Sequence, residues 1–341
     1  MSSHVTSSKL NATETAVCGG FAGLTTRMAI SPLDVVKIRL QVQPEPSNVK
    51  RVFSMSGGNA VKSTVKYSGI AQAFKTILAE EGIRGLFKGN VAAEYLYVTY
   101  GASQFYAYYY LDAFLKTEDR IVPSVKPFIS GMLAGSFATA TTYPFDLLRT
   151  RFAMQGETKV YNSMAHAVSD IYEKEGIRGF YRGLGPSITQ IMPYMGLMFF
   201  SYEGLCSMLQ TLKVKKVISE NHKRTDDMIC GSLAGIISKT GVFPLDVVRK
   251  RLQVQGPHLQ AYVVSTIPSY ADHDSVMGCM KKIVRNEGVW ALYKGIVPGL
   301  LKAGPSGAVY FLMFELAKDV ITALKESGFH LLPEKSSPLY Q

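Results

Sequence analysis

The stretch Pro32-Leu33-Asp34-Val35-Val36-Lys37-Ile38-Arg39 decides the fold, because the chain contains it three times. It recurs as Pro144-Phe145-Asp146-Leu147-Leu148-Arg149-Thr150-Arg151 and as Pro244-Leu245-Asp246-Val247-Val248-Arg249-Lys250-Arg251, at spacings of 112 and 100 residues. Self-similarity at a nearly fixed period is typical of a repeat architecture. The sequence therefore predicts three repeats that each carry one copy of this signature.

Two further landmarks recur in the same order around each signature. Nine residues before each signature proline lies the second glycine of a GxxxG pair, and the pairs are Gly19/Gly23, Gly131/Gly135 and Gly231/Gly235. Downstream, each repeat has a Glu-Gly…Lys/Arg-Gly element, at residues 81–89, 175–183 and 287–295 with Lys or Arg before the last glycine. Small residues at this spacing favour close helix packing in lipid, and the second element fits a short surface helix that ends at a glycine. We interpret both landmarks as structural.

Six apolar stretches lie between these landmarks, two in each repeat. Residues 183–202 are twenty residues without a charge and 127–145 are nineteen, which at about 1.5 Å per residue nearly spans a hydrocarbon core of about 30 Å. The other four lie near 15–31, 89–111, 228–245 and 295–314. Only 18% of residues are charged and 47% are hydrophobic, whereas about a quarter of a soluble chain is charged.

The sequence therefore predicts an all-α membrane protein with six transmembrane helices in three pseudo-symmetric repeats. We place the repeats at 13–120, 121–222 and 223–325, between a polar N-terminal tail (1–12) and a C-terminal tail (326–341). Of the 37 lysines and arginines, 22 fall in the three segments that join the two helices of a repeat. This asymmetry puts those loops on one face of the membrane and both termini on the other.

The acid and the first base of each signature are three residues apart, so on a helix they share a face. The signature proline lacks a donor and bends the helix. Three such helices around a pseudo-threefold axis would bring the acids and bases into one ring, and its members are Asp34, Lys37, Asp146, Arg149, Asp246 and Arg249. We interpret this ring as a gate, because closing it pairs every charge and opening it requires compensating substrate contacts. A single copy would instead indicate charges at a helix end.

Four ionisable residues stand alone within the other apolar stretches: Arg27, Glu94, Lys239 and Lys302. A charge at mid-bilayer depth costs at least about 2.5–3.5 kcal/mol, so such residues usually face a wet cavity. Three bases with one acid suit a diphosphate that also carries a cationic group. We expect these residues to bind substrate.

The three signatures and the Glu-Gly…Gly elements resemble the mitochondrial carrier family over residues 13–325. Further segments are similar to those of members that carry thiamine pyrophosphate. They are Thr26-Arg27 leading into Ile30–Arg39, Leu148–Phe152 with Gln155–Glu157 and Lys159–Asn162, and Ile237–Thr240. The resemblance implies a monomer in the mitochondrial inner membrane, with both termini toward the intermembrane space. It also implies alternating access, exchange of thiamine pyrophosphate against nucleotides, and membrane lipids, cardiolipin among them, as partners.

The resemblance also assigns roles to residues. It makes the charged ring the matrix gate and puts substrate contacts seven residues after Gly89, Gly183 and Gly295, at Leu96, Gln190 and Lys302. Gln41 and Gln253, nine residues after their signature prolines, would brace the gate, whereas Ala153 holds that place in the second repeat. A cytoplasmic gate would use Glu203, Glu315 and Lys318, and it should be weak because its aromatic-acid-x-x-base pattern is whole only at Phe314–Lys318.

The same charged residues also fit other functions. An adenine nucleotide, coenzyme A or another phosphorylated metabolite would use the same three bases, and Glu94 favours a substrate with a positive group. A scaffold or receptor that kept the fold is disfavoured by three intact acid–base pairs. The formal net charge of +11 suits an acidic partner. The sequence has no P-loop or nucleophile–base pattern, and its four cysteines form no metal-binding spacing. We expect no enzyme activity, cofactor, metal or nucleic-acid partner.

Overall fold

The computed structural model describes residues 12–44, 66–117, 126–214, 223–264, 267–270 and 276–326. These residues form helices and connections, without a strand among them. The expected tails, 1–12 and 326–341, lie outside the described residues except for Ala12 and Glu326. The chain forms two compact units, one up to Ser31 and from Leu301 onward, the other Pro32–Leu300.

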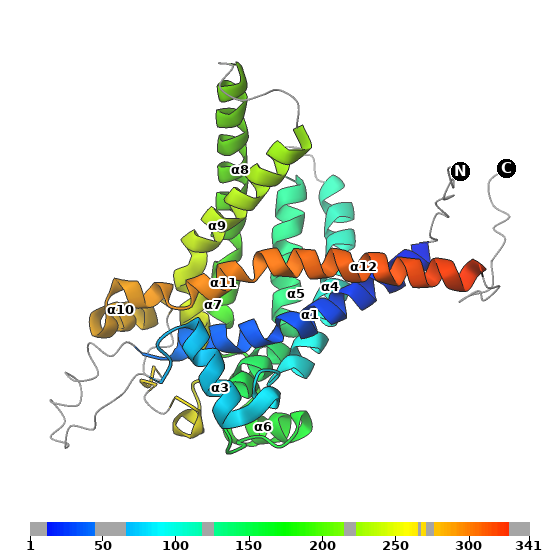
Figure 1. Cartoon of the computed structure of the whole chain (residues 1–341). Helices are drawn as coiled ribbons and strands as arrows, with labels where there is room; N and C mark the ends of the chain where they lie inside the picture. The colour runs from blue at the N-terminus through cyan, green and yellow to red at the C-terminus, as the bar shows by residue number, and fades with distance from the viewer. Residues whose placement is uncertain are drawn as a thin grey trace. The chain divides into compact units, whose positions relative to one another are not determined.

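Each repeat has a long helix, a surface helix and a second long helix (Figure 1). The first long helices, which run through the signature prolines, are α1 (Ala12–Val42), α5 (Lys126–Ala153) and α9 (Lys223–Gln253). The surface helices are α3 (Ile70–Gly85), α6 (Met164–Phe180) and α10 (Val276–Glu287). The second long helices are α4 (Asn90–Lys116), α7 with α8 (Leu184–Thr189, Ile191–Val214), and α11 with α12 (Ile296–Leu301, Ala303–Glu326). Two short 3-10 helices are η1 (Leu259–Ala261) and η2 (Val289–Tyr293).

This order confirms the predicted all-α fold of three repeats with two long helices each. Hydropathy alone is a weaker guide: among the described residues, one helical stretch, Met228–Gln253, is long and apolar enough to qualify as a membrane span, with a mean hydropathy of 1.4. The other long helices are rich in small and hydroxylated residues, and several end in signature charges. The six-helix assignment therefore depends on the repeats and not on the apolarity of each helix.

In the unit Pro32–Leu300, α4 lies along α5 and α8 lies along α9 (Figure 1). Each surface helix packs on the C-terminal half of its own repeat's first long helix, around a fully buried isoleucine. These isoleucines are Ile77, Ile171 and Ile283. Three separate apolar clusters thus hold the signature segments in place from one side of the bundle.

Paired glycines set the course of the chain between each surface helix and the next long helix. Gly82, Gly176 and Gly288 have φ values of 67°, 65° and 87°, and the second set has values of 82°, 84° and 78°. The second set is Gly89, Gly183 and Gly295, directly before the second long helices. A left-handed φ is easily adopted only by glycine. Gly288 directly follows α10, as expected, whereas Gly82 and Gly176 are kinks inside α3 and α6, which continue for a few residues beyond them.

The second glycine of each pair also lies against the backbone of a signature base from another repeat. A side-chain carbon at Gly89 would be 2.5 Å from the carbonyl oxygen of Arg149. The corresponding distances are 3.0 Å from Gly183 to the carbonyl oxygen of Arg249 and 3.3 Å from Gly295 to that of Lys37. Close approach of two backbones without a side chain between them positions the signature helices.

The other unit contains the N-terminal part of α1 and all of α12, which lie side by side (Figure 1). The hydroxyl of Tyr310 is 3.5 Å from the place of a side-chain carbon on Gly19, so this GxxxG glycine faces a neighbouring helix as predicted. In the Pro32–Leu300 unit, the corresponding place on Gly135 has the Tyr100 hydroxyl at 3.8 Å. On Gly23, Gly131, Gly231 and Gly235, no neighbouring atom of the described residues lies within 4 Å of that place. The prediction of close packing at the GxxxG pairs is therefore wrong for these four glycines.

We expect Gly89→Ala to destabilise the folded protein. The new methyl group would collide with the Arg149 carbonyl and hold a non-glycine residue at a φ of 82°, for a cost of about 1–3 kcal/mol. Gly101→Ala is the matched control, since Gly101 lies within α4 and has no atom within 4 Å. Thermal unfolding of both variants in detergent measures the difference, and equal unfolding midpoints would contradict the expectation.

Candidate gate and substrate pathway

The six signature charges form three ion pairs, each joining the acid of one repeat to the base of another. The pairs are Asp34 with Arg149, Asp146 with Arg249, and Asp246 with Lys37. The Lys37 Nζ lies 2.6 Å from Asp246 Oδ2, and the Arg249 Nη2 lies 2.9 Å from Asp146 Oδ2. The side chains of all six are at most 17% exposed. The pairing is cyclic, and the three signature helices converge at this ring.

An aromatic ring lies against each of the three bases. Lys37 is 5.7 Å from the centre of Phe243, Arg149 is 5.7 Å from Tyr97, and Arg249 is 5.6 Å from Tyr143. Sheltered cation–π contacts of this kind are worth about 0.5–2 kcal/mol each. These aromatic partners were not predicted from the sequence. Tyr143 and Phe243 directly precede signature prolines, so the pattern was present in two repeats.

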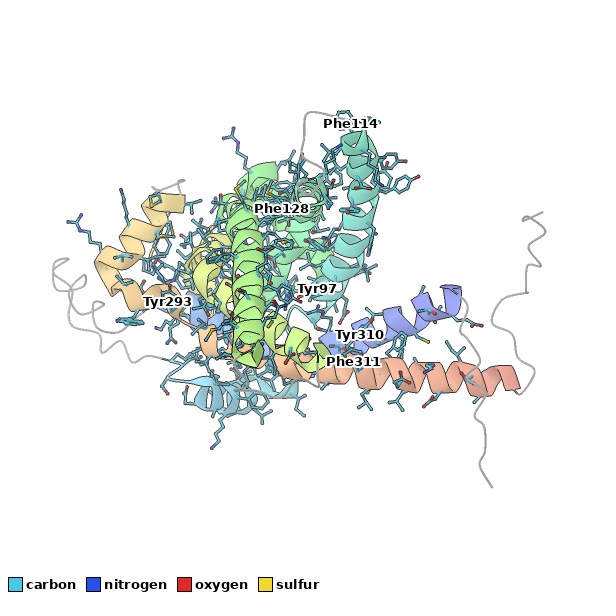
Figure 2. The ribbon with its side chains drawn as sticks, turned by 90° about the horizontal axis from the view of Figure 1, so that it is seen from above. Tyr97, Phe114, Phe128, Tyr293, Tyr310 and Phe311 are labelled. Carbon is cyan, nitrogen blue, oxygen red and sulfur yellow. The ribbon has the colours of Figure 1, made fainter. Side chains whose placement is uncertain are left out.

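The first repeat departs from this pattern. Ser31 stands before its signature proline, and the aromatic partner of Arg149 comes instead from α4, as Tyr97 (labelled in Figure 2). The Arg149 Nη1 also donates a hydrogen bond of 3.2 Å to the Tyr97 hydroxyl. Arg149 of the ring is thereby hydrogen-bonded to α4, the helix that carries two of the expected substrate contacts, Glu94 and Leu96.

The two expected braces contact the ring. The Gln41 Nε2 donates to Asp246 Oδ2 at 3.1 Å, and Gln253 donates to Asp146. Gln253 also donates to the Tyr143 hydroxyl at 3.1 Å. Ala153, the corresponding residue of the second repeat, has no side-chain donor. Its carbonyl oxygen accepts a hydrogen bond of 2.9 Å from Arg39 Nε.

A second set of ion pairs lies on the loop side of the ring. The last arginine of each signature binds the glutamate of its own repeat's Glu-Gly element through both carboxylate oxygens. These pairs are Arg39 with Glu81, Arg151 with Glu175, and Arg251 with Glu287. Each arginine is at most 1% exposed and also donates to carbonyl oxygens of the following repeat. This second set of pairs was not predicted from the sequence, although the arginine and the glutamate each recur in all three repeats.

Glu81 illustrates how strongly these pairs favour the charged state. Burial would raise the pKa of Glu81, but the hydrogen bonds and positive charges of Arg39 and Lys88 outweigh burial and hold that pKa below its usual value. Because the folded-state pKa is lowered, the carboxylate's contribution to stability is present above its unfolded pKa and is lost only as pH falls through the lowered value. The link between surface helix α3 and the signature segment is therefore intact near neutral pH.

Four of the expected substrate residues belong to the Pro32–Leu300 unit. Glu94 and Leu96 lie on α4, Gln190 lies between α7 and α8, and Lys239 lies on α9. The Asn90 Nδ2 is within 3.4 Å of Glu94 Oε1. The Gln190 Oε1 is buried without a hydrogen-bond partner among the described residues, which is costly unless another donor reaches it.

Gln190 lies between α7 and α8 because a nearby proline removes one helical hydrogen bond. Pro193 follows three residues later and cannot donate the helical hydrogen bond, so α7 ends at Thr189 and α8 begins at Ile191. Lys302 stands in the same relation to Pro305, between α11 and α12. The backbone of Gln190 nevertheless stays helical, with φ of −76° and ψ of −18°, and it donates to Pro186 and accepts from Tyr194 at 3.1 and 3.0 Å. The two prolines therefore remove single hydrogen bonds next to two of the three positions seven residues after the glycine, whereas α4 runs through Leu96.

In the other unit, Arg27 lies on α1 and Lys302 directly precedes α12. Of the expected cytoplasmic gate, Lys318 Nζ is 3.1 Å from Glu315 Oε2, three residues away on the same helix. Both of these side chains are exposed, at 38% and 59%. Glu203 belongs to the Pro32–Leu300 unit and is exposed on α8. The described pair is therefore a surface pair within one helix.

Three helix–surface helix–helix repeats, joined by a ring of inter-repeat ion pairs, define a membrane carrier built on pseudo-threefold symmetry. The chain belongs to the mitochondrial carrier family: the family model described as mitochondrial carrier protein matches residues 8–119, 122–213 and 220–325. Membership implies the mitochondrial inner membrane as location and transport as the kind of activity.

Similar proteins cover almost the whole chain. A protein of Neosartorya fischeri is 44% identical over 306 residues, which is 89% of this chain and 91% of the relative. A Neurospora crassa protein is 42% identical over 325 residues, 92% and 93% of the two chains, and one from Coccidioides immitis is 43% identical over 322 residues, 92% and 95%. Each of the three is named mitochondrial thiamine pyrophosphate carrier 1.

Proposed function

We propose that this protein transports thiamine pyrophosphate across the mitochondrial inner membrane by alternating access, in exchange for nucleotides. The observation that carries the proposal is the cyclic ring of ion pairs between the repeats, in a chain 42–44% identical to proteins named for this substrate. The ring acts as the matrix gate and is closed here. Opening it breaks three buried pairs, so transport requires substrate contacts that offset this loss.

The chemistry of thiamine pyrophosphate matches the residues that the sequence predicts to bind substrate. A diphosphate needs cationic donors, which Arg27, Lys239 and Lys302 supply, and a cationic ring favours a carboxylate, which Glu94 supplies. The unpartnered oxygen of Gln190 would accept a bond from an amino group of the substrate. Leu96 would contribute apolar contact. An adenine nucleotide, coenzyme A or another phosphorylated metabolite is the second candidate, because the same bases would hold its phosphates.

The proposal includes an orientation and an oligomeric state. Both termini face the intermembrane space, because the lysine- and arginine-rich loops occupy the opposite face. The protein is a monomer, since the ring uses one copy of each repeat from the same chain. Protease accessibility of terminal tags in mitoplasts and the mass in detergent by light scattering test these two points.

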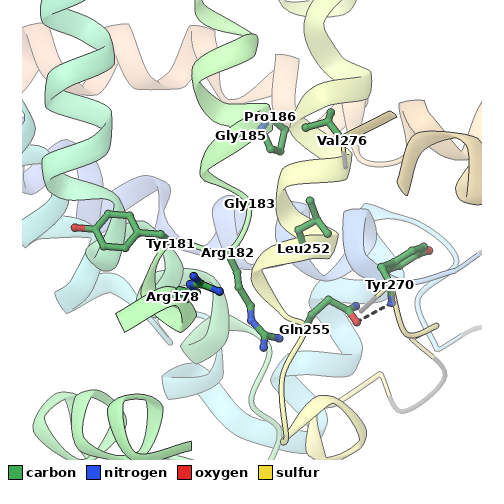
Figure 3. A pocket seen from close by; sticks show the side chains of 10 residues that line it. All are labelled: Arg178, Tyr181, Arg182, Gly183, Gly185, Pro186, Leu252, Gln255, Tyr270 and Val276. Atoms are coloured by element: carbon green, nitrogen blue, oxygen red, sulfur yellow. Dashed lines mark hydrogen bonds between the residues drawn. The ribbon is translucent and has the colours of Figure 1, made fainter. Parts of the chain in front are cut away.

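An acidic phospholipid, with cardiolipin as the named case, is the proposed lipid partner. A cavity of 410 Å³ lies between α6–α7 of the second repeat and α9–α10 of the third (Figure 3). Arg178 and Arg182 contribute guanidinium groups to it, and Leu252 and Val276 contribute apolar walls. Phosphate oxygens on the arginines with acyl chains toward the apolar walls would suit this lining.

We expect selective binding and exchange of thiamine pyrophosphate. Ligand that binds only the folded protein raises its thermal unfolding midpoint, so the diphosphate should raise it more than thiamine, thiamine monophosphate or an adenine nucleotide does. Liposomes loaded with nucleotide should then take up thiamine pyrophosphate. Lys239→Ala should reduce uptake at least about tenfold, the loss of about one charge-assisted contact, without loss of folding. A response to nucleotides alone would move the substrate to the second candidate.

The gate proposal predicts that Asp246→Asn weakens closure. This change removes the acid that binds Lys37 at 2.6 Å and Gln41 at 3.1 Å, so the closed state loses one of three inter-repeat pairs. Cysteines introduced across the signature helices should crosslink less efficiently in the variant. Asp112→Asn is the control, because Asp112 pairs with Lys116 one turn away on the same helix. Unchanged crosslinking in Asp246→Asn would refute the gate.

The lipid proposal predicts that added cardiolipin raises the unfolding midpoint of the wild-type protein and that Arg178→Ala reduces this rise. The physical reason is the loss of one of two guanidinium groups at the cavity. Lys281→Ala, an exposed base on α10 outside the cavity lining, serves as control. The same rise in wild type and Arg178→Ala would exclude this cavity as the lipid site.

A further inference from the structure

The ring contains one base more than the signature requires. Besides Arg249, Asp146 binds Lys250, whose Nζ lies 3.3 Å from Oδ1 and 3.2 Å from Oδ2 of that carboxylate. Lys250 follows the first base of the third signature, where the other signatures have Ile38 and Thr150. With Lys250, the ring of three acids holds four bases.

Lys250 is held firmly in place. It is 7% exposed, and its ammonium group also donates to Thr150 Oγ1 and to Gln253 Oε1, each at 2.9 Å. An ammonium has three protons to donate, and Asp146, Thr150 and Gln253 supply three acceptor groups. Because Gln253 itself donates to Asp146, the lysine, the glutamine and the carboxylate form one connected network. Lys250 is therefore the fixed base of Asp146.

Arg249 is held less completely. Its Nη2 donates to Asp146 at 2.9 Å and its guanidinium lies over Tyr143, but its Nε is buried without a hydrogen-bond acceptor among the described residues. Arg149, by contrast, donates to Asp34 and to the Tyr97 hydroxyl. A guanidinium carries five donors that match phosphate oxygens. Of the two bases of Asp146, Arg249 is the one with donor capacity left for another anion.

We propose that Lys250 is a second counterion for Asp146, which lets Arg249 leave this carboxylate and bind a phosphate group of the substrate while Asp146 stays neutralised. A buried carboxylate that loses its base is strongly destabilised, so in a ring with one base per acid this step would be opposed. A substrate phosphate then first displaces a gate base at the contact between the second and third repeats, where Arg249 pairs with Asp146. Lys250 is a positioning residue, and the transport part of the inference rests on the proposed function.

The first test needs no substrate. In the wild-type background, Arg249→Ala should lower the thermal unfolding midpoint only slightly, because Lys250 still pairs with Asp146. In a Lys250→Thr background, which gives the third signature the residue of the second, Arg249→Ala leaves Asp146 without a base. We expect the drop in the double variant to be at least twice the sum of the two single drops. Additive drops would overturn the inference.

Two matched variants show that the coupling is local and depends on charge. Arg149 binds Asp34, whereas the Lys250 ammonium donates to Asp146, Thr150 and Gln253. Arg149→Ala and Lys250→Thr should therefore deviate from additivity by much less than Arg249→Ala and Lys250→Thr do. Lys250→Arg keeps the charge and should leave Arg249→Ala mild. If Lys250→Thr proves too unstable to purify, the same cycle with Lys250→Gln decides the point, since the amide keeps hydrogen bonding and loses the charge.

The second test measures exchange of thiamine pyrophosphate in liposomes. Lys250→Thr should lower the maximal rate at least tenfold with little change in KM, because the lost contribution acts when Arg249 leaves Asp146, and Lys250→Arg should restore the rate. An unchanged rate in Lys250→Thr would overturn the inference. If the wild-type protein exchanges no thiamine pyrophosphate, the proposed substrate fails, while the unfolding cycle still decides the role of Lys250.

Discussion

The buried bond between the last arginine of each signature and the glutamate of its repeat's surface helix is the constraint on which the rest of the structure depends. Arg39, Arg151 and Arg251 lie at most 1% exposed, and a guanidinium in that position must be paired and fully hydrogen-bonded. Removing one partner of such a pair costs about 3–5 kcal/mol. The same arginines donate to carbonyl groups of the following repeat, so each one joins a signature helix to its surface helix and to the neighbouring repeat.

The second layer of ion pairs is more deeply buried than the ring: its side chains are at most 4% exposed, whereas those of the ring are up to 17% exposed. In the proposed gate, opening breaks the ring and leaves this deeper layer intact. The positive-φ glycines contribute to the same end, since Gly89, Gly183 and Gly295 put the start of each second long helix against the backbone of a gate base. A movement of those helices on binding substrate would reach the ring directly through these contacts.

The three repeats are alike in backbone and unlike in detail. The residue before the proline is Ser31, Tyr143 or Phe243, and the residue after the first base is Ile38, Thr150 or Lys250. These differences decide which aromatic ring lies on which base and how many bases an acid has. Pseudo-symmetry provides a ring that can close, and departures from symmetry make its three pairs unequal in strength. In the proposed gate, an asymmetric substrate would therefore meet three unequal contacts between the repeats.

By itself the sequence determined the repeats, the two long helices of each, the membership of the charged ring and the recurring glycines, because these follow from periodicity and from local backbone chemistry. The tertiary structure alone decided which acid meets which base, the aromatic partner Tyr97, the burial of Arg151 with Glu175, and the double pairing of Asp146. These contacts join residues tens to hundreds of positions apart, and their partners depend on the rotation of whole helices about their axes. A linear motif gives the spacing of charges along one helix, whereas only packing in three dimensions fixes what each charge faces across the bundle.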